Sequence, residues 1–378
     1  MIMHNAELER ISASLAQAGS AEEVFGTLVG SRDEQLEAAK RLFRQMAKAV
    51  HPDLFQERSD FDQAGAAFKK LVYFWEQAQT RIEHGTYGTA ISTEEFVPFS
   101  MRTKKSHYAV ERLLARGDIS ALYIAASLLD GAPIKCLLKI PVRPEDNDLL
   151  SNEARILTHL HVSQDYPGLH HFVSQLVDSF AYQEQASGIL RQINILSYLD
   201  GFYSLKEVRQ VYPQGVDPRH MAWIWRRLLV ALGFAHSNNV IHGAVLPTHV
   251  LIHPRLHGVI LIDWSYAVLA PSASGESISA ISRDYRDWYP AEVFVREVPL
   301  PGLDIAMAAR CMIDLLGGDY YTRAMPDSVP WQIQSHLKGC TLPNPRQRPQ
   351  DARVLLADFD ALIQRLWGGR TFQEFSMP

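Results

Sequence analysis

The sequence places a lysine where burial would make its charge costly. Lys139 lies in 134–140, an apolar run that reads as a β-strand. A charged group inside such a strand needs a partner, because removing an unpaired charge from water is expensive. Glu153 follows on a segment with helical spacing and is the natural counter-ion. The pattern therefore predicts a Lys139–Glu153 ion pair, with a lysine that reaches solvent from the strand as the alternative.

Two later stretches carry further candidates for chemistry. The first is 240–252, which includes His242, and the second is 261–265, which includes Asp263. Their order and spacing resemble the catalytic loop and the metal-binding loop of protein kinases. The resemblance implies that His242 is a structural residue and that Asp263 is the ligand of Mg²⁺.

The loop departs from the kinase pattern at the positions that carry the chemistry. Ala244 stands in place of the aspartate that takes the proton of the acceptor, and His249 stands in place of the asparagine that holds a second metal ion. Loss of a positioned base typically costs about 10²–10⁴ in rate. Neutral imidazole is a poor ligand for Mg²⁺, which prefers oxygen. We therefore expect a pseudokinase rather than an enzyme, with Mg²⁺ binding at Asp263 weak or absent.

The resemblance also implies a nucleotide site. Gly117 is the one glycine left of the three with which a kinase hairpin closes over the phosphates. Lys139 and Glu153 would align the α- and β-phosphates, and Leu196 would guard the nucleotide pocket. An ordinary hairpin explains Gly117 equally well, so the sequence leaves ATP binding open.

Residues that hold the kinase fold together are intact. Glu292 ends a Tyr-Pro-Ala-Glu run, and Asp304 and Arg348 match the buried aspartate and the arginine of the large lobe. The resemblance covers about 107–368. It predicts an α+β, two-lobed kinase-like fold, with a small lobe at 107–196 and a large lobe at 197–370.

The first ninety residues read as helices. The segments Gln35–Val50 and Phe61–Ile82 each carry one apolar face. Between them stand His51, Pro52 and Asp53, where the proline disfavours further helix. Two helices of this length with a short loop between them should pack antiparallel.

This arrangement resembles a J-domain, the module by which co-chaperones stimulate DnaK-type ATPases. The resemblance covers about 20–88, after an extra helix at Ala6–Gln17, and gives a first domain at 1–88 with a linker at 89–106. It implies that His51, Pro52 and Asp53 trigger ATP hydrolysis in the partner. It assigns the docking of the partner to the basic face formed by Lys40, Arg41, Arg44 and Lys48. A helix ended by proline, beside an ordinary solvated basic face, is the alternative.

The composition excludes some classes of partner. A formal net charge of −5 at pH 7 gives no bulk attraction for nucleic acid or an anionic membrane. The sequence has no apolar run long enough to span a bilayer, and its start does not resemble a signal peptide. The three cysteines, Cys136, Cys311 and Cys340, are far apart and indicate a reducing compartment. We expect a cytoplasmic protein that binds neither nucleic acid nor membrane.

Three functions fit these patterns. The first is a co-chaperone that recruits and stimulates a DnaK-type chaperone, with a pseudokinase domain that binds a client protein or regulates the first domain. The second is an atypical Ser/Thr protein kinase that its J-domain targets. The third is a scaffold of two binding modules without a chaperone role.

Overall fold

The computed structural model describes residues 2–18, 20–55, 58–83, 87–88, 98–103, 105–129, 132–163, 168–184, 188–368 and 372–377. The chain divides into two compact units, Met1–Phe96 and Val97–Pro378.

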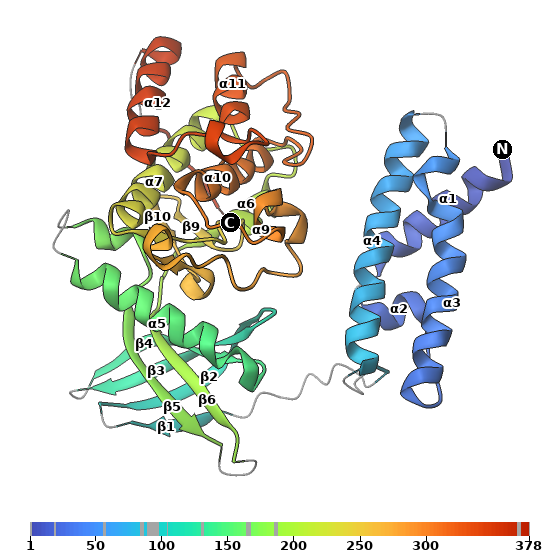
Figure 1. Cartoon of the computed structure of the whole chain (residues 1–378), viewed down its shortest axis with the longest axis horizontal. Coiled ribbons are helices and arrows are strands. Elements are labelled where there is room, and N and C mark those ends of the chain that lie inside the picture. Colours follow the sequence, from blue (N-terminus) through green and yellow to red (C-terminus); the bar gives the residue numbers. More distant parts are fainter. Residues whose placement is uncertain are drawn as a thin grey trace. The chain divides into compact units, whose positions relative to one another are not determined.

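The N-terminal unit is a bundle of helices (Figure 1). They are α1 (Ile2–Gln17), α2 (Ala21–Phe25), α3 (Arg32–Val50) and α4 (Arg58–Glu83), with a 3₁₀ turn, η1 (Pro52–Leu54), before α4. Helices α3 and α4 lie side by side as the two arms of a hairpin. The two helices predicted from periodicity are confirmed. Helix α3 begins before the expected Gln35 because Ser31 and Glu34 form a capping box that satisfies the free N–H groups of its first turn.

An aromatic cluster joins three helices of this bundle. The ring of Trp75 on α4 stacks on Phe43 of α3 at 5.2 Å and meets the edge of Phe25 of α2 at 6.3 Å. Aromatic side chains bury large apolar areas, so these contacts fix how the three helices pack. Helix α1 adds the buried side chains Leu8, Ile11 and Leu15.

The second unit begins with an antiparallel sheet of six strands in the order β1-β2-β3-β4-β6-β5. The strands are β1 (Phe99–Arg102), β2 (His107–Arg116), β3 (Ser120–Leu129), β4 (Ala132–Pro141), β5 (Leu176–Gln183) and β6 (Leu190–Ser197). Helix α5 (Asn147–Val162) packs against β5 and β6. This mixed α/β arrangement is compatible with a small kinase-like lobe.

Strand β1 lies within the range expected as a linker. Phe99 pairs with Val110 and Arg102 pairs with His107, so the strand adds an edge to the sheet. Lys104 and residues 89–97 of the expected linker lie outside the described residues.

The rest of the second unit is mostly helical. Its longer helices are α6 (Leu205–Val211), α7 (Pro218–Ser237), α10 (Pro301–Leu315), α11 (Trp331–Cys340) and α12 (Ala352–Trp367), and its short ones are α8 (Pro271–Ser274) and α9 (Ala291–Phe294). Helix α10 is apolar on nearly all sides, which places it at the centre, against α7 and α11. The short strands β7 (Tyr203–Ser204), β8 (Val240–Ile241), β9 (Val250–His253), β10 (Gly258–Leu261) and β11 (Val268–Leu269) form two small sheets.

The fold also bears on the expectations for the three cysteines and for membrane-spanning helices. Cys136, Cys311 and Cys340 are all buried and unpaired. Among the helices that the structure describes, none combines the length and the apolar character needed to cross a membrane.

Candidate functional site

The ammonium group of Lys139 is the centre of a buried polar network. Its Nζ lies 2.8 Å from Oε1 of Glu153 and 2.7 Å from Oδ1 of Asp263, and it donates a hydrogen bond to Oγ of Ser265 at 2.9 Å. Lys139 is only 3% exposed, so the lysine does not reach solvent. The ion pair with Glu153 that the sequence predicts is therefore present, and Asp263 joins it from a distant part of the chain.

Two asparagines that the sequence reasoning missed position this network. Nδ2 of Asn194 on β6 donates to Oε2 of Glu153 at 3.0 Å. Nδ2 of Asn152 on α5 donates to the carbonyl oxygens of Ser265 at 3.1 Å and Ala267 at 2.8 Å. These bonds tie α5 to the loop that carries Asp263. Asn194 could have been found from the sequence as Lys139 was. It is an amide within the apolar strand β6, and a buried polar group needs a partner.

Neighbouring charges keep Lys139 protonated and Asp263 ionised. Burial alone would lower the pKa of the Lys139 ammonium, but Asp263 and Glu153 raise it above its usual value. Burial would also raise the pKa of the Asp263 carboxyl, but Lys139 and His249 hold it well below its usual range. Lys139 and Asp263 are therefore an ion pair at neutral pH.

The backbone at Asp263 is strained. Its φ of 60° and ψ of 69° lie in the left-handed region, which few residues other than glycine adopt. Such a conformation costs on the order of 1–3 kcal/mol and persists only where the surroundings hold it. The bond from Lys139 holds the carboxylate in this position.

His242 is a structural link in the loop. It is fully buried, and Nε2 donates to the carbonyl oxygen of Ile262 at 3.0 Å while Nδ1 accepts from the N–H of Ala244 at 3.2 Å. Burial lowers the pKa of His242 to about 4, so the ring is neutral. The N–H groups of His242 and Gly243 both donate to the Asp304 carboxylate at 2.8 Å. Asp304 thereby fixes the start of the loop.

His249 occupies the position beside Asp263 where an amide ligand would be expected. Its Nε2 lies 3.3 Å from Oδ2 of Asp263, and its Nδ1 lies 2.8 Å from the carbonyl oxygen of Ala244. The other oxygen of Asp263 is bonded to Lys139. Because both carboxylate oxygens face nitrogen atoms and Ala244 has no donor side chain, these residues do not fit Mg²⁺, which requires several oxygen ligands. The described residues also contain no group of three His, Cys, Asp or Glu side chains placed to hold a metal.

The hairpin turn between β2 and β3 is bonded to itself and to a distant segment. The N–H of Gly117 donates to the carbonyl oxygen of Ser120 at 2.9 Å. A Cβ at Gly117 would meet that oxygen at an ordinary 3.6 Å, so the turn does not need glycine there. Oδ2 of Asp118 accepts from Oγ of Ser282 at 2.9 Å and from the N–H of Arg283 at 2.7 Å. No local pattern in the sequence predicts this contact between Asp118 and the residues Ser282 and Arg283.

Leu196 lies on β6 opposite Leu137 of β4 and is 7% exposed. The two side chains add to the apolar core of the unit. A buried ion pair between the Arg348 guanidinium and the Glu292 carboxylate holds the helical part, and Nε2 of His236 lies 2.9 Å from Oδ2 of Asp304.

The tripeptide of the first unit lies at the end of α3. His51 is exposed and ends the helix with extended backbone, and its ring meets the edge of Phe68 at 5.2 Å. Pro52 begins η1, and the side chain of Asp53 lies outside what the structure describes.

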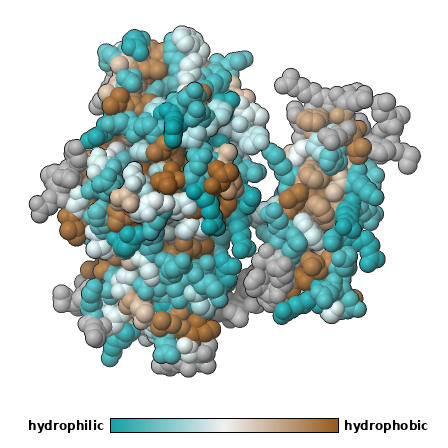
Figure 2. Space-filling model, viewed as in Figure 1, coloured by the Kyte–Doolittle hydropathy of each residue, from teal (hydrophilic) through white to brown (hydrophobic). Residues whose placement is uncertain are grey.

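The basic residues of α3 face solvent. Arg41, Arg44 and Lys48 are exposed, and Lys40 pairs with Glu37 at 3.4 Å. Figure 2 shows hydrophilic side chains along the edge of this unit over α3.

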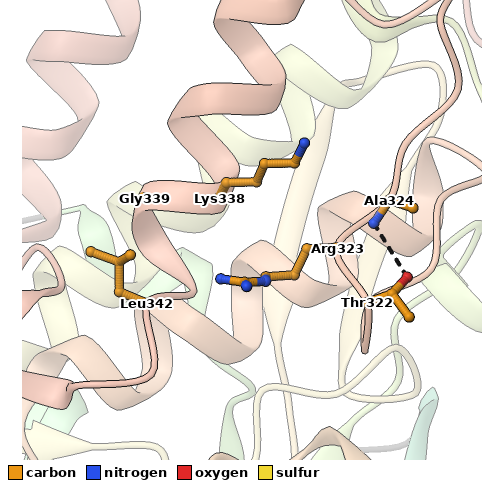
Figure 3. Close-up of a pocket in the computed structure, with 6 residues that line it drawn as sticks. All are labelled: Thr322, Arg323, Ala324, Lys338, Gly339 and Leu342. Atoms are coloured by element: carbon orange, nitrogen blue, oxygen red, sulfur yellow. Dashed lines mark hydrogen bonds between the residues drawn. The ribbon is translucent and has the colours of Figure 1, made fainter.

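A surface pocket of about 540 Å³ lies between α11 and the preceding loop. Its lining includes Arg323 and Lys338, but the charged ends of these side chains point in different directions (Figure 3). The two cations do not converge on one ligand position.

Comparison with known proteins supports part of this picture. No protein-family model matches the chain. The chain is 28% identical over 166 residues to casein kinase II subunit alpha' of the yeast Saccharomyces cerevisiae. The match covers 43% of this chain and 43% of the yeast protein, so it spans less than half of either. The similarity supports a protein-kinase-like domain in this chain and makes ATP binding plausible.

Proposed function

We propose that this protein is a co-chaperone of the J-domain type, which recruits and stimulates a DnaK-type ATPase, and that its kinase-like unit is a pseudokinase that binds a client protein or regulates the first unit. The observation that carries the proposal is the exposed His51 at the end of α3, beside the exposed basic side chains of that helix.

The α3–α4 hairpin supports the proposed docking face, which needs a rigid helix. The stack of Phe43 on Trp75 locks α3 against α4, so the basic face is presented on a rigid helix. Clustered positive charges speed encounter with an acidic partner surface and fix its orientation. The turn at Pro52 then places His51 at the end of that face.

The pseudokinase half of the proposal rests on the loop that carries Ala244. A methyl group cannot take a proton, and Ala244 is fully buried. The carboxylate of Asp263 is held by Lys139 and His249. The unit keeps the ion pairs that maintain its fold, so binding without phosphoryl transfer is the role that its residues support best.

The direct test is ATP hydrolysis by a DnaK-type chaperone in the presence of this protein. We expect His51→Gln to abolish the stimulation, and His171→Gln, which changes an exposed histidine in the other unit, to leave it intact. Stimulation by His51→Gln equal to that of the wild type would refute the proposal.

The docking face is tested by charge reversal. Arg44→Glu should weaken binding to the chaperone, most clearly at low salt, because screening reduces such attractions. Arg10→Glu makes the same change of charge on an exposed position of α1 and should bind as the wild type does. Equal losses in both variants would point to net charge rather than to the α3 face.

One observation favours a second function, an atypical Ser/Thr kinase. Lys139, Glu153 and Asp263 are connected by bonds of 2.7–2.8 Å, and kinases need this lysine–glutamate pair in place. Incubation with labelled ATP and Mg²⁺ or Mn²⁺ tests this alternative. Transfer of label that Lys139→Ala and Asp263→Ala both abolish would replace the pseudokinase assignment.

A further inference from the structure

The segment 372–377 is bound to the helical part of the second unit by an aromatic side chain and by its backbone. Phe375 is 2% exposed, and its ring centroid lies 4.8 Å from that of His220 and 5.4 Å from that of Tyr212. The hydroxyl group of Tyr212 donates a hydrogen bond to the carbonyl oxygen of Ser376 at 2.7 Å. These contacts fix the second half of the segment.

A second phenylalanine adds to a stack of rings. The ring of His257, in the turn between β9 and β10, lies 4.1 Å from the ring of Trp223 on α7, at an angle of 4°. Phe372 also stacks on His257, at 4.3 Å and 20°. His257 has a φ of 49°, in the left-handed region, so its surroundings must hold it there. The aromatic face that the segment contacts consists of Tyr212, His220, Trp223 and His257.

The segment matches the aromatic face only in part. Within the described part of the chain, Nδ1 of His220, Nε1 of Trp223 and Nε2 of His257 are buried without a hydrogen-bond partner. A buried polar atom without a partner costs free energy, because it has lost its bonds to water. Phe372 also stays 70% exposed. The bound segment is therefore an imperfect ligand of this face, and a better one can displace it.

The contacts of the segment are of a kind that a separate peptide can make. Residues 372–377 are neither helix nor strand. Their printed partners are the rings of the face and one hydroxyl donor, that of Tyr212. Aromatic rings bury large apolar areas and orient one another, so two phenylalanines at the right spacing are enough to recognise such a face.

We propose that the aromatic face is a docking surface for an extended segment of a partner protein with two phenylalanines three positions apart, and that 372–377 covers this surface in the free chain. The spacing is that of Phe372 and Phe375, which now occupy the face. A tethered segment competes at an effective concentration on the order of millimolar, so it keeps weak partners away. The proposal goes beyond the co-chaperone function, and its test needs no chaperone.

The test uses the full chain with its aromatic face uncovered. Phe372→Ala together with Phe375→Ala removes both rings and gives what we call the open variant. Glu374→Ala changes the exposed residue between them and is the matched control. The probe is a fluorescent peptide with the sequence of 372–377, and fluorescence anisotropy measures its dissociation constant. A second peptide, with one alanine inserted before its second phenylalanine, tests the spacing.

We expect the peptide to bind the open variant at least about tenfold more tightly than the wild type, because the tethered segment no longer competes. Glu374→Ala should behave as the wild type. The peptide with the inserted alanine should bind the open variant clearly more weakly. The proposal is overturned if a folded open variant does not bind the peptide, if it binds no more tightly than the wild type, or if the spacing makes no difference.

Amide hydrogen exchange decides the matter if the open variant does not fold. Tyr212→Phe keeps the ring and removes the hydroxyl group that donates to Ser376. Exchange in 372–377 should rise in this variant, whereas Tyr182→Phe, which removes a hydroxyl group on β5, should leave it unchanged. Unchanged exchange in Tyr212→Phe would show that the aromatic face does not hold the segment and would overturn the proposal.

Discussion

Nδ1 of His249 lies 2.8 Å from the carbonyl oxygen of Ala244, so the two positions at which the loop departs most from a kinase contact each other. The other ring nitrogen lies 3.3 Å from Oδ2 of Asp263. The imidazole therefore bridges the loop and the carboxylate. The His249 side chain stands where a kinase has an oxygen ligand of the metal. It also contacts Oδ2 of Asp263, which is the other candidate ligand.

The bridge predicts that His249→Asn creates metal-dependent nucleotide binding. An asparagine oxygen is a ligand that Mg²⁺ accepts, and the change frees Oδ2 of Asp263. In this variant, ATP should raise the melting temperature more with Mg²⁺ than without it. The wild type is the reference and should show no such dependence on Mg²⁺. An equal shift with and without Mg²⁺ in His249→Asn would contradict the role given to His249.

Removal of the Lys139 ammonium should destabilise the second unit strongly. In Lys139→Met, the fully buried Glu153 and the largely buried Asp263 lose their cation, which typically costs about 3–5 kcal/mol in the free energy of unfolding. Urea unfolding followed by tryptophan fluorescence measures this change. Lys135→Met on the same strand is the control, because Lys135 is exposed and its Nζ lies over the ring of Tyr198. A loss no larger than that of the control would show that the network is not needed for stability.

The buried His242 and the half-buried His336 predict that the second unit loses stability in acid. Burial lowers the pKa of both His242 and His336 to about 4, whereas an unfolded histidine titrates near 6.5. Between these values the unfolded chain binds protons that the folded chain does not, so stability falls as the pH drops from about 6.5 to about 4. Each histidine should contribute on the order of 3 kcal/mol to this loss.

The variant His336→Gln isolates one of these contributions. Nε1 of Trp225 donates to Nε2 of His336 at 3.1 Å, and a glutamine oxygen can accept the same bond. Unfolding free energies measured between pH 7 and pH 4 should fall less steeply in this variant. Identical slopes for His336→Gln and the wild type would show that this histidine titrates normally in the folded chain.

Asp304→Asn should loosen the loop that begins at His242. One amide nitrogen would replace an oxygen that now accepts from the N–H of His242 or Gly243, so a buried donor would lose its partner. Such a loss costs about 1–3 kcal/mol in the free energy of unfolding. Urea unfolding is the measurement, and Asp287→Asn at an exposed position is the control. Equal stability of Asp304→Asn and the wild type would remove the anchoring role of Asp304.

The first unit was largely predictable from the sequence. Apolar residues at helical spacing predict α3 and α4, because an amphipathic helix must bury one face. The proline at 52 predicts where α3 ends, since it disfavours helix at the preceding residue. The extent of α1, which begins at Ile2 rather than Ala6, was less clear because its first residues carry no apolar period. Whether His51 and the basic face bind a chaperone stays a prediction.

Strand β1 shows a limit of local reasoning. Phe99–Arg102 follows a stretch rich in turn residues and reads as part of a linker, yet it pairs with β2. An edge strand is stabilised by the backbone groups of its neighbour, so its presence depends on a partner that the local sequence does not reveal.

The sequence by itself determined that Lys139 needs a partner and that Glu153 is near enough to provide one, because burial of a lone charge is costly wherever it occurs. Only the tertiary structure decided that Asp263 and Ser265 share the same ammonium group and that Asn194 holds Glu153. It alone also joined Asp118 to Ser282 and His249 to Ala244. Periodicity encodes which face of an element is apolar, whereas a bond between distant side chains depends on how whole elements are placed in three dimensions.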